Sequence, residues 1–193
     1  MFRGPANSHG GPRHPETTSM PYPLVGVMGS GTVESADLAE PLGRWLGENG
    51  YHLLTGGGAG VMAAVCRAFA AVPDRRGVSV GVLPAGPPPG YPNPSLDIII
   101  QTHLPKRGGE GADVLSRNHI NVLSAAAVVA LPGREGTRTE VALALHYRRP
   151  FIAYLGPGGV IAGVSRTTLP AVATTLDEVI AFVRRHVGEP RSA

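Results

Sequence analysis

Short apolar runs alternate along the chain with stretches whose apolar residues recur at helical spacing. Residues 60–72 show the helical pattern, because Val61, Val65 and Phe69 are four residues apart and share one face. The run Leu24–Met28 is short and continuously apolar, which is typical of a strand buried on both faces. The predicted strands are residues 24–28, 51–55, 78–83, 96–101, 126–131 and 151–155, and the predicted helices are residues 35–49, 60–72, 113–123, 135–148 and 175–187.

This alternation predicts an α/β fold, a doubly wound Rossmann-like parallel sheet flanked by helices. The 193 residues, 42% of them hydrophobic, suit a single domain, which we place at residues 21–188. Residues 1–20 are rich in Gly, Pro, Ser and His and are expected to form a disordered tail, with residues 189–193 as a C-terminal tail. Ligands bind such sheets beyond the carboxyl ends of the strands.

Glycine-rich turns follow three of the predicted strands, where each strand meets a helix. A turn that opens a helix presents free backbone N–H groups, which favour an anion. The chain therefore predicts a phosphorylated ligand held between these turns. The candidate ligand-binding residues are Gly29, Ser30, Gly31, Thr55, Gly56, Gly57, Gly58, Gly60, Met62, Gly133, Arg134, Gly136 and Thr137.

Several of these residues also have plainer interpretations. Three consecutive glycines exceed what a tight turn needs, and close approach of a ligand would explain them. Met62 belongs to the second turn but has the spacing of a core residue. Ser30 suits either a phosphate contact or the cap of the first helix. Thr137 and Glu140 have the spacing of a capping box, so Glu140 has a purely structural alternative.

Charge and composition exclude several classes of function. The formal net charge is +3, but no central basic run alternates with aromatic residues, so no nucleic-acid groove is expected. Lys106 is the single lysine, which excludes a P-loop and makes a Schiff-base enzyme chemically unattractive. A dinucleotide fold would need a glycine where Glu34 stands and an acid after the second strand, and the chain has neither.

The single cysteine, Cys66, excludes a disulfide framework and a zinc site built from cysteines. The histidines form no HExxH-like pair, so no metal site is expected. No apolar run reaches the roughly 18 residues of a membrane span. We therefore expect a cytoplasmic protein without a membrane partner.

The segments TGGGAGVM (55–62) and PGREGTRTE (132–140) resemble the paired motifs of the lonely-guy (LOG) superfamily, also called lysine decarboxylase-like. Two further segments, VGVMGSG (25–31) and SRNHINVLSAAAVVALPG (116–133), are more similar to a sister group that contains the molybdenum-cofactor carrier proteins. The resemblance covers about residues 24–155 and implies a Rossmann-like fold.

The LOG resemblance implies a phosphoribohydrolase, which cleaves the bond between base and ribose of a nucleoside 5′-monophosphate, with Arg117 and Glu140 as the catalytic pair. The carrier group also retains both residues. Its resemblance implies instead a protein that binds molybdenum cofactor, a phosphorylated pterin, as cargo and catalyses nothing. A nucleotide sensor acting through a partner is a third possibility. No other cofactor is expected.

Two positions depart from the LOG motifs. Arg134 replaces the second glycine of the motif PGG, so its guanidinium would either add a phosphate contact or obstruct the turn. Asn118 replaces the lysine beside the catalytic arginine. LOG proteins form dimers or tetramers, and the apolar segment 141–149 is suited to pack against a second copy, so a homodimer or homotetramer is expected.

Overall fold

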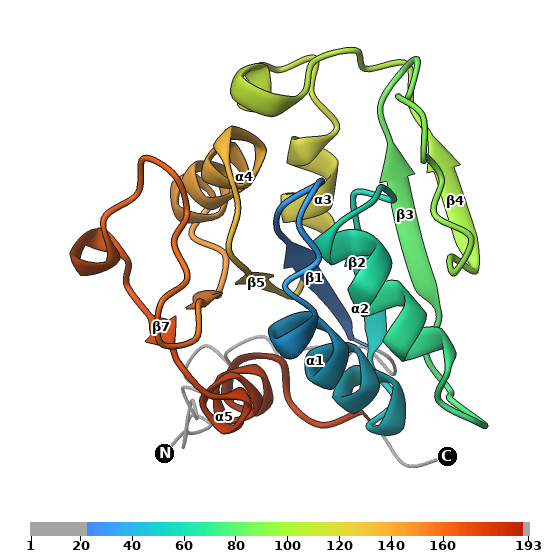
Figure 1. The fold of residues 1–193 in the computed structure, drawn as a ribbon, viewed down its shortest axis with the longest axis vertical. Coiled ribbons are helices and arrows are strands. Elements are labelled where there is room, and N and C mark those ends of the chain that lie inside the picture. The colour runs from blue at the N-terminus through green and yellow to red at the C-terminus, as the bar shows by residue number, and fades with distance from the viewer. Residues whose placement is uncertain (1–22, 191–193) are drawn as a thin grey trace, which may run out of the picture.

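The computed structural model describes residues 23–190; the whole of the predicted N-terminal tail, residues 1–20, and residues 191–193 lie outside this range. Seven strands form one parallel sheet in the order β4-β3-β2-β1-β5-β6-β7 (Figure 1). The strands are β1 (Leu24–Met28), β2 (His52–Thr55), β3 (Ser79–Leu83), β4 (Ile98–Gln101), β5 (Ala127–Ala130), β6 (Phe151–Tyr154) and β7 (Val172–Ala173). The helices are α1 (Ala36–Glu48), α2 (Val61–Ala70), α3 (Asn118–Ser124), α4 (Glu135–His146) and α5 (Leu176–Val187), with short 3-10 turns at Gly108–Glu110 and Arg166–Thr168.

Two apolar cores, one on each face of the sheet, confirm the doubly wound arrangement. Helices α1, α2 and α5 cover one face, where Phe69 and Val183 pack against strand residues such as Val27. Helices α3 and α4 cover the other face, where Val122 and Val141 pack in the second core. Both faces of the central strands are therefore buried, which explains their continuous apolar runs.

The chain reverses its direction across the sheet between β1 and β5. Strands β1 to β4 proceed outward on one side, and β5 then returns to pair with β1 on the other side. This is the topological switch point, where doubly wound sheets bind ligands at the carboxyl ends of the strands.

Two details differ from the sequence prediction, although the connection between β3 and β4 contains no helix, as predicted. Helix α3 begins at Asn118 rather than at residue 113, because residues 113–116 form a turn in which the Ser116 N–H donates to the Asp113 carbonyl at 2.9 Å. Strand β7 has only two residues, too few to show a pattern. None of the helices within residues 23–190 is long and apolar enough to span a lipid bilayer.

Candidate functional site

The three glycine-rich turns meet at the switch point and hydrogen-bond to one another. The Ser30 N–H donates to the Pro132 carbonyl at 3.0 Å, and the Val61 N–H donates to the Ser30 carbonyl at 2.9 Å. The Ser30 hydroxyl accepts from the backbone N–H groups of Thr32 and Val33, so it stabilises its own turn and does not cap α1. The turns at the carboxyl ends of these adjacent parallel strands are thus connected to one another through backbone hydrogen bonds.

Each glycine of the triplet after β2 leaves space for a different neighbour. A Cβ on Gly56 would lie 2.2 Å from Nη2 of Arg117, and one on Gly58 would lie 2.1 Å from Cζ of Tyr91. Gly57 has a φ of +76°, which favours glycine, and its N–H donates to the buried Thr55 hydroxyl. Side chains of the protein itself therefore occupy the space that we had assigned to a ligand.

Helix α4 begins at Glu135, and no side chain caps its first turn. Thr137 is consequently the third helical residue, so the capping-box interpretation of Thr137 and Glu140 is wrong. A Cβ on Gly133 would lie 2.1 Å from the Thr137 Oγ1, which explains the glycine there. The Thr137 hydroxyl is buried and makes no hydrogen bond within residues 23–190. The first turn thus presents backbone N–H groups and an unpartnered hydroxyl, the donors that an anion needs.

Arg117 and Glu140 form a buried ion pair beside this helix start. Arg117 precedes α3 and Glu140 lies in α4; their exposed fractions are both 7%, and Nη1 lies 3.2 Å from Oε1. Burial raises the pKa of Glu140, and the nearby Arg117 guanidinium offsets part of that rise. The Arg117 Nε is buried without a partner in the described residues. The pair therefore combines a carboxyl that retains its proton to higher pH with a cation that keeps one donor free.

Two asparagines lie near Arg117 and Glu140. They were not among the candidate site residues predicted from the sequence. Asn118 Nδ2 donates to the Thr139 Oγ1 at 3.1 Å, which joins α3 to α4. Asn121, one helical turn after Arg117, is fully buried and close enough to the Glu140 carboxyl to lower its pKa. No hydrogen bond to its amide is formed within the described part of the chain. In the sequence, only the position of these two asparagines close to Arg117 could have indicated them as site residues.

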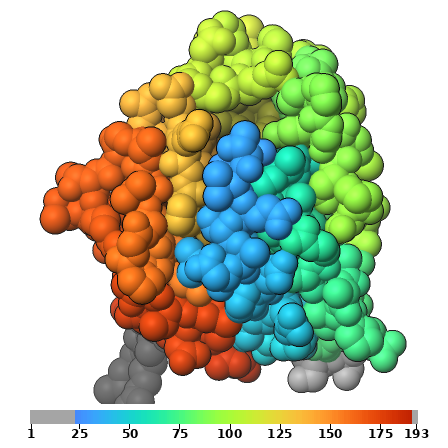
Figure 2. Space-filling view, viewed as in Figure 1, coloured from blue at the N-terminus to red at the C-terminus, as the bar shows by residue number. Residues whose placement is uncertain are grey.

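Arg117 and Glu140 border a cavity of about 220 Å³ at the switch point. Figure 2 shows this side of the molecule, hollowed between the blue segment after β1 and the yellow-green segment that arches over it. The cavity is lined by Gly29, Gly31, Met62, Pro84, Tyr91, Arg107, Gly108, Arg117, Asn118, Gly136, Thr137 and Glu140.

The structure separates the predicted site residues into three groups. Seven of them line the cavity: Gly29, Gly31, Met62, Arg117, Gly136, Thr137 and Glu140. The remainder shape the turns behind it, and Arg134 lies elsewhere. Arg134 is exposed and borders a separate hollow with Val33 and Val160. Arg134 is not among the residues that line the switch-point cavity.

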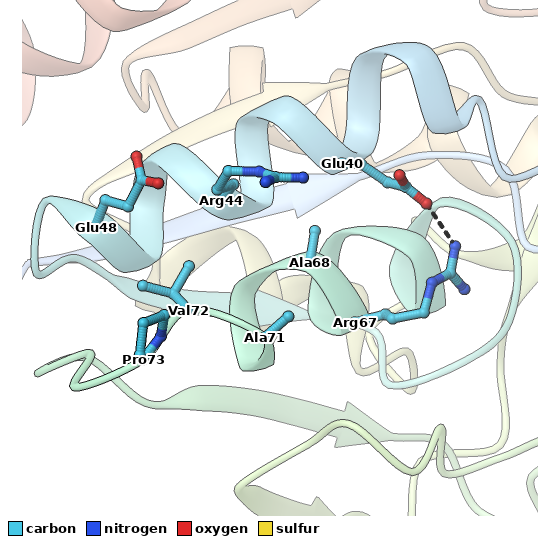
Figure 3. Close-up of a pocket in the computed structure, with 8 residues that line it drawn as sticks. All are labelled: Glu40, Arg44, Glu48, Arg67, Ala68, Ala71, Val72 and Pro73. Carbon is cyan, nitrogen blue, oxygen red and sulfur yellow. Dashed lines mark hydrogen bonds and ion pairs between the residues drawn. The ribbon is translucent and has the colours of Figure 1, made fainter.

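A second cavity, of about 260 Å³, lies between α1 and α2 (Figure 3). Glu40, Arg44 and Glu48 project from α1 on one side, and Arg67 projects from α2. The Arg67 guanidinium bonds to Glu40 at 2.8 Å and also to Glu34, so its charge is balanced within the protein. The polar groups here are exposed, as expected of a solvated helical surface, and none of them is buried without a partner.

Comparison with known proteins places these features in a family. The model of the SLOG cluster4 family matches residues 22–180. The molybdenum cofactor carrier protein of Chlamydomonas reinhardtii is 29% identical, with a TM-score of 0.63, 87% of this chain covered and 99% of that chain. The molybdenum cofactor binding protein of the phototrophic bacterium Rippkaea orientalis is 27% identical, with a TM-score of 0.56, 87% of this chain covered and 86% of that one.

The crystal structure of TM1055, a structural genomics target, has the same fold, with a TM-score of 0.66 at 23% identity over 84% of this chain and 99% of that one. A separate comparison with curated protein sequences found no match. The resemblance inferred from the glycine-rich motifs is confirmed by the family match.

Proposed function

The chain belongs to the SLOG cluster4 family, and from this premise we propose that it binds a phosphorylated, nucleotide-like ligand in the switch-point cavity. One observation carries the proposal: Thr137 and Arg117 border this cavity, and the Thr137 hydroxyl and the Arg117 Nε are buried without a hydrogen-bond partner in the described residues. Buried polar groups in proteins are almost always hydrogen-bonded. A ligand that supplies acceptors to both would satisfy them.

In this proposal the phosphate lies at the start of α4. The backbone N–H groups at Gly136 and Thr137 and the Thr137 hydroxyl donate to its oxygens, and the positive end of the helix dipole adds to the attraction. The sugar lies toward Arg117 and Glu140, which border the same cavity.

We propose that the bound ligand is a nucleoside 5′-monophosphate and that the protein cleaves its N-glycosidic bond. In that reaction water adds to the anomeric carbon while the bond from this carbon to the base breaks, through an oxocarbenium-like transition state. The base leaves with the electron pair of that bond and takes up a proton, and the attacking water loses one, so that the products are the free base and ribose 5-phosphate. Glu140 stabilises the developing positive charge or takes a proton from the attacking water. Its raised pKa suits proton exchange nearer to neutral pH than an exposed glutamate allows. Arg117 orients Glu140 and bonds to the sugar.

The similarity to the two molybdenum cofactor proteins favours a second candidate function. In that case the same cavity binds molybdenum cofactor as cargo and catalyses no reaction. The phosphate of the pterin then takes the position proposed for the nucleotide phosphate, and Arg117 with Glu140 acts only in binding.

Incubation with nucleoside 5′-monophosphates, followed by chromatographic assay for free base, tests the hydrolase. We expect base release by the wild-type protein and none by Glu140→Gln, which keeps the shape of the side chain without its charge. Base release that is equal in both proteins would contradict the catalytic role of Glu140. Absence of release from every nucleotide, with molybdenum cofactor retained through gel filtration, would establish the carrier function instead.

A further inference from the structure

Four residues of the cavity lining come from segments that carry none of the glycine-rich motifs. Pro84 and Tyr91 come from the connection between β3 and β4, and Arg107 and Gly108 come from the segment before α3. The same cavity is lined by Thr137 and Arg117, which carry the buried unpartnered donors. The proposed phosphate contacts use none of these four residues.

Hydrogen bonds to the glycine triplet position the segment that carries Tyr91. The backbone N–H of the buried Asn93 donates to the Gly57 carbonyl at 2.9 Å, and its side-chain amide donates to the Gly58 carbonyl at 3.2 Å. The phenol end of the Tyr91 ring fills the space where a side chain on residue 58 would stand. The ring is thus placed against the turn and borders the cavity before any ligand arrives.

Arg107 borders the same cavity as Tyr91. Its Nη1 donates to the Gly86 carbonyl at 3.2 Å, which ties the guanidinium to the β3–β4 connection that also carries Tyr91. A guanidinium is planar and stacks on aromatic rings, as a tyrosine ring does. Two flat groups from separate segments therefore border one cavity.

We infer that Tyr91 and Arg107 form a subsite for the planar heteroaromatic ring of the ligand, so that the cavity selects molecules that join such a ring to a phosphorylated group. This inference rests on the proposed function and specifies its ligand further. Stacking on an aromatic side chain tolerates different ring systems, because each presents a π face. A nucleobase and a pterin share this chemistry.

The test compares adenosine 5′-monophosphate with ribose 5-phosphate, which lacks the ring, by isothermal titration calorimetry on the full chain. Tyr91→Leu keeps apolar volume over Gly58 without a π face, and Tyr91→Phe keeps the π face without the hydroxyl. We expect Tyr91→Leu to weaken binding of the nucleotide about tenfold and binding of ribose 5-phosphate less than twofold. Tyr91→Phe should bind both within about threefold of wild type.

A third probe, pterin-6-carboxylate, distinguishes the two ring systems. A selective loss for this compound in Tyr91→Leu, with nucleotide binding unchanged, supports the subsite and assigns it to a pterin. Equal losses for ribose 5-phosphate and the nucleotide would overturn the inference, since Tyr91 would then only support the turn. Unchanged binding of both ring compounds would overturn it as well. A wild-type protein that binds none of the three probes overturns the proposed function together with the inference.

Discussion

Thr137 is the residue whose surroundings depend most on a ligand. Its exposed fraction is only 2%, yet its hydroxyl has no partner in the described residues. An unsatisfied buried hydroxyl costs about 1–3 kcal/mol. If a bound anion accepts the hydrogen bond as we propose, this cost is recovered, so the unpartnered hydroxyl would favour binding over an unoccupied cavity.

Replacing Thr137 by valine removes this hydroxyl at nearly constant volume. We expect Thr137→Val to bind ribose 5-phosphate about tenfold more weakly than wild type, because a hydrogen bond to a charged group contributes about 1.5–3 kcal/mol. Calorimetry measures this affinity. The ligand-free variant should be as stable as wild type toward urea, or more stable by about 1 kcal/mol. Thr137→Ser keeps the hydroxyl and is the control; equal affinity of valine and serine variants would exclude the proposed contact.

Glu140 gives the stability of the protein a specific dependence on pH. Burial raises its pKa above the ordinary value of 4.5, against the opposing effect of Arg117. A raised pKa means that the folded state binds the proton more tightly than the unfolded state. The contribution of the protonated Glu140 carboxyl to the free energy of unfolding is therefore complete below about pH 4.5. It is lost as the pH rises through the pKa that this carboxyl has in the folded state.

Glu140→Gln cannot lose a proton. We expect the stability of wild type relative to this variant to decline as the pH rises above 4.5. Urea unfolding of both proteins between pH 4 and 8 measures the difference. Glu135→Gln removes an exposed carboxyl from the same helix and serves as the control. If the stability of wild type relative to Glu140→Gln instead increases with pH, the effect of Arg117 on the pKa of Glu140 outweighs that of burial.

At the scale of elements, the close approach of α1 to α2 depends on Gly43. A Cβ at this position would lie 2.3 Å from the Val65 carbonyl oxygen. Gly→Ala in a helix ordinarily stabilises by about 0.5–1 kcal/mol, because glycine has the greater freedom in the unfolded chain. At residue 43 the contact with α2 should make the same substitution destabilising.

We expect Gly43→Ala to lower the free energy of unfolding by about 1–3 kcal/mol, since the backbone of α2 must move to accept the methyl group. Chemical denaturation provides the measurement. Gly158→Ala is a matched control, because a Cβ there meets no atom within 4 Å. Equal stabilities of the two variants would mean that the helices separate without cost.

At the scale of the whole molecule, we propose that the chain forms a homodimer or homotetramer through α4 and its neighbour α3. Leu123 and Leu145 are large apolar residues on these two adjacent helices, exposed to 42% and 41%. Burial of exposed leucines against a second copy would remove apolar area from water. This is consistent with the apolar segment 141–149.

Leu145→Glu should dissociate such an oligomer, because it places a charge in an apolar contact. Sedimentation velocity at micromolar concentration measures the mass. We expect a dimer or tetramer for wild type and a monomer for this variant. Val160→Glu substitutes an apolar residue that is exposed to 63% and lies in a loop outside α3 and α4, and it should leave the mass unchanged. A monomeric wild-type protein would refute the proposal.

The amino-acid sequence by itself determined the parallel α/β fold and the position of the three turns. Strands buried on both faces require continuous apolar runs, and the glycines mark where strands meet helices, so both features appear as local patterns. Arg117 and Glu140 were also identifiable, because both lie within segments that resemble family motifs.

Only the tertiary structure decided which residues outside the motifs line the cavity and what roles the glycines have. Tyr91 lies in a proline-rich connection without periodic pattern, and it reaches Gly58 only because β3 pairs with β2. Asn121 and Glu140 meet because α3 and α4 pack on the same face. Contacts between segments distant in sequence depend on how the sheet is wound, and no local pattern of residues encodes that geometry.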